Sequence, residues 1–349
     1  MKMGLFIWIL IIPQLVLSLF SPLFRTKPVF RWYYTRVFHP IFEDVNRFRW
    51  KFRAIPAFYL SIYAYCTFLF FKDIEGLIRS RLFGVERLLI IPVALSAPII
   101  TGLLTIWIKP KSTYASPMLD AYDELIFHSG VSCRTCKLPK FARTKHCPIC
   151  DQCVQLADHH CVWANNCIGR GNYQYFYLFL VSNVFLTNYG FLRLLFLQRF
   201  VHSRQLLILS ILLGCFGVIL AVFSYFQFVL VRDGMTTNEE NKWLVIHDMI
   251  RARQMVTDDT GKYYFRLLAD CQEDSAESLT NPRHSSQGPN EFHLNDSSPD
   301  IYVYYSTNPY DNATYDVKNP KEILSTAAIT NIYDEGGFWK NLMARVDFT

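Results

Sequence analysis

Charged residues are scarce in this sequence. Only 18% of its 349 residues are Asp, Glu, Lys or Arg, whereas 51% are hydrophobic and 16% are aromatic. A soluble domain of this size would space its apolar residues at helical or strand periods, so that each element keeps a polar face. Here they are concentrated in long runs without a polar face, which excludes an ordinary soluble globular protein.

Five apolar runs are candidates for membrane-spanning helices. A hydrocarbon core of about 30 Å needs roughly 20 apolar residues of helix, with about 17 as the lower limit. Four runs meet this length, and the run at 54–71 is marginal, so the chain has four or five spans. We expect an α-helical polytopic membrane protein of about five spans, with runs at 3–20, 54–71, 88–108, 175–192 and 206–231.

The first run could instead be a cleaved signal peptide, because Lys2 precedes it. Its apolar stretch is too long for a signal-peptide core, however, and no small-x-small cleavage site follows it. We therefore expect a retained helix.

The distribution of Lys and Arg predicts the orientation, because cytosolic loops carry more of these residues. The segment 25–53 carries eight, the loop 72–87 four and the loop 198–205 two. Placing 25–53 in the cytosol also places residues 109–174 and the tail after residue 231 there. The net charge of +6 needs no nucleic-acid partner, because anionic lipid headgroups account for basic loops.

This orientation divides the chain into four parts. A small cytosolic cysteine-rich domain is expected between the third and fourth spans. The parts are 1–108 with three spans and the basic loop 25–53, the cysteine-rich domain 109–174, 175–231 with two spans, and the cytosolic tail 232–349.

Seven of the ten cysteines fall between residues 133 and 167. Disulfides are disfavoured on the reducing cytosolic side, and interleaved histidines have no purpose in a disulfide framework. Cysteines paired two residues apart, with histidines at a distance, are typical of tetrahedral zinc sites.

The number of possible ligands favours two zinc ions. Structural zinc is four-coordinate, so two sites use eight residues, three would need twelve, and one would leave six idle. Two residues remain, and the count alone does not identify them. The ten candidates are Cys133, Cys136, His146, Cys147, Cys150, Cys153, His159, His160, Cys161 and Cys167.

The stretch Asp158-His159-His160-Cys161 suggests a use for the two remaining residues. A thiolate is the nucleophile of cysteine chemistry, and a neighbouring histidine lowers the thiol pKa. A carboxylate bound to one ring nitrogen fixes the tautomer, so that the other nitrogen can face the thiol. One histidine of the pair would then bind zinc, and the other would serve the cysteine.

The stretch 133–176 resembles the cysteine-rich domain of the DHHC-type protein S-acyltransferases. It follows C-x2-C-x9-H-C-x2-C-x2-C-x4-D-H-H-C-x5-C-x4-N-x3-F without a gap or substitution. After the last span, TTNE at 236–239 is similar to the TTxE motif of that family. Residues 331–342 resemble its NPYDxGxxxNW element, with Ile332 in place of Pro, Leu342 in place of Trp and one extra residue between Gly336 and Asn341.

The resemblance implies which residues bind zinc and which react. Cys161 would be the nucleophile, His159 its base and Asp158 the group that orients the base. Thr236, Thr237 and Asn341 would brace the catalytic domain against the tail. The implied zinc sites are Cys133, Cys136, His146 and Cys153 for one ion, and Cys147, Cys150, His160 and Cys167 for the other.

The resemblance also implies a palmitoyltransferase that uses two steps. Cys161 would take a long-chain acyl group, such as palmitate, from acyl-coenzyme A as a thioester and pass it to cysteines of membrane proteins. Arg143 and Lys145 are candidates to pair with the coenzyme A phosphates. The acyl chain would lie in a cavity among the spans, with Ser182, Asn183 and Thr187 as candidate lining residues.

Residues 157–176 read ADHHCVWANNCIGRGNYQYF, which is similar to the endoplasmic-reticulum branch of this family in fungi. That similarity implies a multi-pass protein of the endoplasmic-reticulum membrane with a cytosolic catalytic domain. It also implies substrates such as SNAREs and other single-pass proteins. Two other classes compete with this interpretation: a non-catalytic membrane zinc-finger scaffold, and a membrane ubiquitin ligase, which would leave Asp158, His159 and Cys161 unexplained.

Overall fold

The computed structural model describes residues 12–14, 16–44, 47, 49–112, 120–268 and 302–346. Within them, four helices have the length and composition to cross a membrane, which confirms the predicted class of helical polytopic protein. The expected first span, 3–20, lies largely outside the described residues. The four helices are Lys51–Arg81, Glu86–Trp107, Tyr173–Leu197 and Arg204–Arg232.

Two of these four spans are built from several helical segments. Before the first of them, α2 (Pro28–Tyr33) continues into the π-helical segment η1 (Tyr34–Glu43). The first two spans contain short π-helical and 3₁₀ turns, and the last two are continuous α-helices. The segments are α3 (Lys51–Leu69), η2 (Phe70–Ile74), α4 (Glu75–Ile78), η3 (Arg79–Arg81), η4 (Glu86–Ile90), α5 (Ile91–Trp107), α6 (Tyr173–Leu197) and α7 (Arg204–Arg232).

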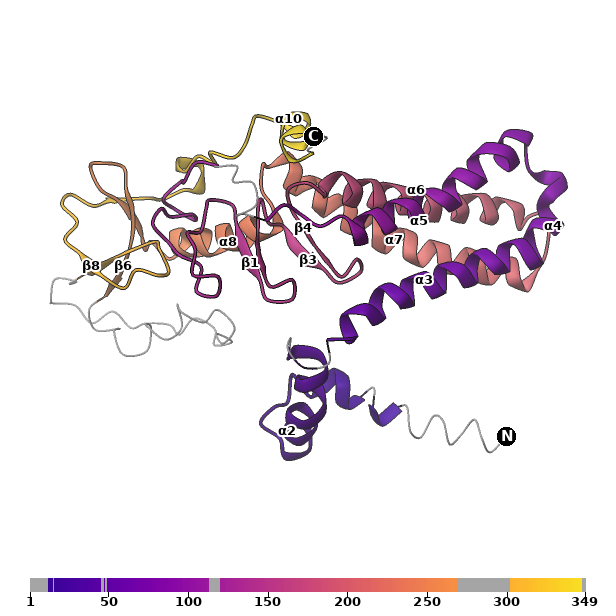
Figure 1. The fold of residues 1–349 in the computed structure, drawn as a ribbon, viewed down its shortest axis with the longest axis horizontal. Coiled ribbons are helices and arrows are strands. Elements are labelled where there is room, and N and C mark those ends of the chain that lie inside the picture. The colour runs from indigo at the N-terminus through magenta and orange to yellow at the C-terminus, as the bar shows by residue number, and fades with distance from the viewer. Residues whose placement is uncertain are drawn as a thin grey trace.

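Helices α5, α6 and α7 lie side by side, and α3 approaches them obliquely (Figure 1). Small residues let α6 and α7 come close, as is common in membrane helix pairs. A Cβ atom added at Gly214 would lie 2.9 Å from the Phe191 ring, so only glycine fits this crossing.

Two of the three polar residues considered as lining of an acyl cavity connect the spans. Ser182 lies 3.2 Å from the Thr101 hydroxyl of α5, and the Tyr59 hydroxyl of α3 donates to the Asn183 side chain at 3.0 Å. The Thr187 hydroxyl bonds the Asn183 carbonyl of its own helix. These hydrogen bonds give the polar groups partners on the helices, as is common in spans, and a role of the three residues in an acyl cavity stays a prediction.

The cysteine-rich region forms two small antiparallel hairpins. One pairs β1 (Lys145–Cys147) with β2 (Gln152–Val154), and the other pairs β3 (His159–Cys161) with β4 (Asn166–Ile168). The Asn166 side chain donates to the Thr105 and Ile108 carbonyls at the end of α5. The second hairpin is thereby fixed to the membrane-spanning bundle.

The tail contains a β-sheet that the sequence analysis did not predict. After α8 (Thr237–Arg251), five antiparallel strands pair in the order β8-β7-β6-β5-β9, and the chain ends with the turn η6 (Thr326–Ala328) and the helix α10 (Phe338–Arg345). The strands are β5 (Met255–Thr257), β6 (Tyr263–Leu268), β7 (Tyr302–Ser306), β8 (Thr314–Tyr315) and β9 (Lys321–Glu322).

A buried ion pair joins the cysteine-rich region to α8. The Arg143 guanidinium donates to both carboxylate oxygens of Glu239, at 2.6 and 2.8 Å, and to the Gly234 carbonyl at 3.2 Å. Tyr333, near the chain end, lies with its ring 4.5 Å from the guanidinium. Three distant segments therefore meet at one arginine.

We predict that Arg143→Met strongly destabilises the protein, because it leaves the Glu239 carboxylate buried without its cation. Breaking such a pair costs about 3–5 kcal/mol, whereas an exposed pair contributes less than about 1 kcal/mol. Thermal unfolding in detergent, monitored by size-exclusion chromatography, measures the difference. Arg251→Met, at an exposed pair with Asp248, is the control and should melt close to wild type. An Arg143→Met protein with the same melting temperature as the Arg251→Met control would contradict the prediction.

Candidate active site and metal centres

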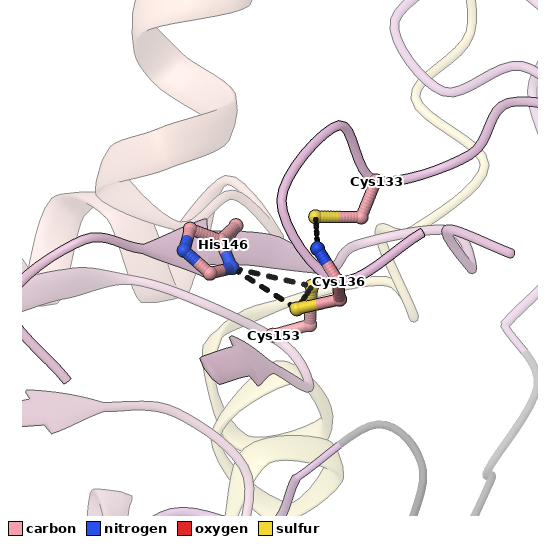
Figure 2. A group of neighbouring side chains, drawn as sticks. All are labelled: Cys133, Cys136, His146 and Cys153. Atoms are coloured by element: carbon pink, nitrogen blue, oxygen red, sulfur yellow. Dashed lines mark hydrogen bonds between the residues drawn. The ribbon is translucent and has the colours of Figure 1, made fainter. Parts of the chain in front are cut away.

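The first group of cysteines and histidine gathers around the β1–β2 hairpin. His146 and Cys153 face each other across the hairpin, and the Cys133–Cys136 loop closes over them (Figure 2). The His146 Nδ1 atom lies 3.3 Å from the Cys136 sulfur and 3.8 Å from the Cys153 sulfur. The four ligand atoms all lie within 4.8 Å of one another.

The second group repeats this design on the β3–β4 hairpin. His160 is paired across the strands with Cys167, while Cys147 at the end of β1 and Cys150 in the turn after it supply the other two ligands. The His160 Nδ1 atom lies 3.4–3.7 Å from the three sulfurs. Each group thus combines residues of different segments, which explains the interleaved order along the chain.

Both groups fit a tetrahedral metal ion. With zinc–ligand bonds of about 2.0–2.3 Å, the edges of a tetrahedron are about 3.3–3.8 Å long. The sulfur–nitrogen distances of 3.3–3.8 Å fall in this range. Three soft sulfurs and one imidazole nitrogen are a donor set that zinc prefers. Two clusters able to hold a metal are therefore present, as predicted, and neither includes His159 or Cys161.

The alternation of a β-strand separates the two adjacent histidines. Successive side chains of a strand point to opposite faces, so His159 and Cys161 share one face of β3 and His160 lies on the other. His160 turns to the second cluster, while His159 and Cys161 turn to the start of α6. The order His159, His160, Cys161 would reveal this division if the strand were known, but a strand of three residues is too short to be recognised from the sequence.

Asp158, His159 and Cys161 lie together as one interacting group. The buried Asp158 carboxylate lies 2.5 Å from the His159 Nδ1 atom. Cys161 lies close enough to the His159 ring to shift its pKa, and the ring meets that of Phe176 edge-on, with the centroids 5.4 Å apart. The structure thus brings together the three residues expected to do chemistry.

The electrostatics of this group favour a charged pair. Burial lowers the pKa of His159, but hydrogen bonds to Asp158 and Cys161 outweigh it and raise that pKa to about 10. Burial also works against the Cys161 thiolate, yet the hydrogen bond and charge of His159, with the backbone N–H groups of Trp163 and Ala164, lower its pKa. The arrangement therefore stabilises an imidazolium–thiolate pair.

The TTNE motif holds Asp158 from the other side. The backbone N–H of Thr237 donates to Asp158 at 2.7 Å and its hydroxyl at 3.1 Å. Thr236 caps α8 in a capping box with Glu239, and its hydroxyl donates to the Ala157 carbonyl at 3.1 Å. The first residues of α8 thus fix the aspartate that orients His159.

The C-terminal element packs where α7 ends. The buried Asn341 amide donates to the Arg232 carbonyl at 3.0 Å and to the Asp334 carboxylate at 2.8 Å. A second stretch of the sequence, 308–311, also reads NPYD, but it lies in the turn between β7 and β8 and no glycine or asparagine follows it at the spacing of the family element. The later element is therefore the one beside the site.

Of the two residues expected to contact coenzyme A, the structure disagrees with the expectation for Arg143. The Arg143 guanidinium is buried, and Glu239 and Gly234 occupy its donors, so it is not available to a phosphate. Lys145 begins β1 and is exposed.

An apolar pocket lies between the spans and the loop that follows Cys161. Trp163 and Ala164 form its end near the sulfur, and residues of α3, α5 and α6 form its walls. Apart from the hydroxyl of Tyr59, its lining side chains are apolar or indole. The lining residues are Tyr59, Leu60, Pro98, Ile99, Gly102, Leu103, Ile106, Trp163, Ala164 and Phe179.

Comparison with known proteins agrees with this geometry. Residues 126–244 match the family model of the DHHC palmitoyltransferases. The chain is 38% identical to palmitoyltransferase SWF1 of Kluyveromyces lactis, over 99% of both chains. The same palmitoyltransferase of Saccharomyces cerevisiae is 38% identical (96% of this chain, 97% of the relative), and that of Candida glabrata 42% identical over the same shares.

The chain therefore belongs to the DHHC palmitoyltransferase family. Within that family it is similar, over nearly its whole length, to the SWF1 palmitoyltransferases of several yeasts.

We predict that Cys147→Ser lowers the zinc content of the purified protein from two ions to about one per chain, because the second cluster loses a soft ligand. Metal analysis by mass spectrometry measures this content. Cys66→Ser, in α3, is the control and should keep two ions. Equal zinc contents in the two variants would contradict the assignment of the second cluster.

Proposed function

We propose that this protein is a protein-cysteine S-palmitoyltransferase in which Cys161 carries the acyl group between two thioester exchanges. One observation supports this assignment above the others. The Cys161 sulfur is outside both metal clusters, shares one face of β3 with His159, whose charge lowers its pKa, and is followed in the chain by two residues, Trp163 and Ala164, that line a small apolar pocket between the spans.

In the first step, the Cys161 thiolate attacks the carbonyl carbon of palmitoyl-coenzyme A. A carbon–sulfur bond forms to Cys161, and the bond to the coenzyme A sulfur breaks. The leaving thiolate takes the proton that His159 holds, so the histidine becomes neutral. Asp158 keeps the ring oriented throughout, because Thr237 fixes the carboxylate.

In the second step, neutral His159 takes the proton of the thiol of a substrate cysteine. The resulting thiolate attacks the acyl carbon, and the Cys161 thiolate leaves and again pairs with the imidazolium. Charge and protons therefore balance over one cycle, and the free enzyme is restored.

We propose that the acyl chain enters between the spans at the apolar pocket, which is itself too small to hold a long chain, so the surrounding helices would move apart to admit it. Burial of each methylene contributes about 0.8 kcal/mol, so a long chain is retained best where water is excluded. Trp163 and Ala164 lie both at the pocket and directly after the reactive strand. Lys145 remains the proposed contact for a coenzyme A phosphate, because it is exposed on the hairpin that carries the metal ligands.

The two proposed zinc ions have a structural role. All eight ligands come from segments with little other secondary structure, so the metals would hold the hairpins in register. His160 is the link, because a metal on its ring fixes β3 and with it the positions of His159 and Cys161.

We propose the endoplasmic-reticulum membrane as the location, with the catalytic domain in the cytosol. The basic segment 25–53 supports the cytosolic orientation, and the sequence of residues 157–176, similar to the endoplasmic-reticulum branch of the family in fungi, supports the membrane. Contacts of Asn166 with the end of α5 hold the site at the membrane surface. The expected substrates are therefore cysteines next to a span, as in SNAREs and other single-pass proteins.

Labelling with an alkyne analogue of palmitate tests the proposed acyl-enzyme. We expect a hydroxylamine-sensitive label on the wild-type protein in membranes, and none on Cys161→Ala. Cys215→Ala, which removes an exposed thiol of α7, is the control and should label as wild type does. An unlabelled wild type with both metal ions bound, or a label that survives Cys161→Ala, would favour a scaffold over a transferase.

A further inference from the structure

Arg345 is a buried cation at the end of α10, with only 4% of its surface exposed. Its guanidinium donates to the Tyr177 hydroxyl at 3.2 Å, and to the Leu230 and Met235 carbonyls at 3.0 and 2.7 Å. Among the described residues, no carboxylate pairs with it directly. Because a buried charge is costly without a counter-ion, its retention here calls for a specific explanation.

One hydrogen bond of Arg345 connects it to Asp158 through residues 235–237, which follow α7. Met235, whose carbonyl accepts a hydrogen bond from Arg345, directly precedes the TTNE motif. Thr236 and Thr237 then bond Ala157 and Asp158. Arg345 thus fixes the start of the segment that holds the aspartate.

A second connection leads to the same place through α6. Tyr177 stacks on Tyr173 with ring centroids 5.6 Å apart, and the Tyr173 hydroxyl donates to the Leu156 carbonyl at 3.1 Å. Phe176, between these tyrosines in the chain, presents its ring to His159. Both routes from Arg345 therefore end at residues 156–159.

The Arg345 guanidinium also packs on the aromatic side chains of α6. It lies over the face of Tyr173, 5.9 Å from the ring centroid. The cation is thus held against the tyrosine whose hydroxyl reaches Leu156, without touching Asp158.

We infer that Arg345 is a positioning residue for acyl transfer: the three hydrogen bonds that its charged guanidinium donates hold the segments that place Asp158 and His159 for Cys161. This inference rests on the proposed roles of Asp158, His159 and Cys161. It gives the C-terminal helix a part in the reaction, although the helix contributes no group that contacts the substrates.

The test compares Arg345→Lys, Arg345→Gln and Arg345→Met in the full-length protein in detergent, with palmitoyl-coenzyme A as substrate. For Arg345→Met we expect kcat for acyl-enzyme formation to fall by about 10- to 100-fold, the cost of misplaced catalytic groups, with KM changed less than about twofold. Arg345→Lys keeps the charge and should recover part of the loss, whereas Arg345→Gln, which is similar in length but neutral, should not. Lys340→Met, on the exposed side of the same helix, is the control.

Several results would overturn the inference. They are an Arg345→Met protein as fast as wild type, equal losses in Arg345→Lys and Arg345→Gln, or a raised KM at unchanged kcat. Loss of bound metal or aggregation in all three variants would assign Arg345 to folding alone and would also overturn it. Absence of a Cys161-dependent acyl-enzyme in the wild type is a different outcome, because it would refute the proposed function itself.

Discussion

Two adjacent histidines can serve different tasks here because neighbouring side chains of a β-strand point to opposite faces. In β3, this constraint directs His160 to a metal cluster and leaves His159 and Cys161 together on the other face. If the segment were helical, the three side chains would spread around one turn, and the thiol would not share a face with its histidine. The geometry of the site thus depends on a three-residue strand.

So short a strand is stable only through its surroundings. The register with β4 places His160 opposite Cys167, so that a metal bound there would lock the hairpin. Asn166 ties that hairpin to α5, and Thr237 of α8 holds the neighbouring Asp158. The membrane bundle, the metal clusters and the tail therefore converge on residues 158–161, and the hydrogen bonds of Arg345 add support from the last helix.

The sequence predicted the parts of the molecule whose signals are local. Long apolar runs identify the spans, and ligand spacing identifies two groups of four metal ligands that the fold brings together. The five-stranded sheet of the tail was missed because its strands have two to six residues, too few to establish an alternating pattern. The role of Arg143 was also missed, because its partner Glu239 lies 96 residues away and only the fold brings the two together.

The central claim is that the Cys161 sulfur takes no part in metal binding and is therefore available to carry an acyl group. X-ray absorption at the zinc edge tests it directly, by comparing the wild-type protein with Cys161→Ser. We predict an average of three sulfurs and one nitrogen per zinc ion in both proteins. A lower sulfur coordination number in Cys161→Ser would place this sulfur on a metal and would contradict the account.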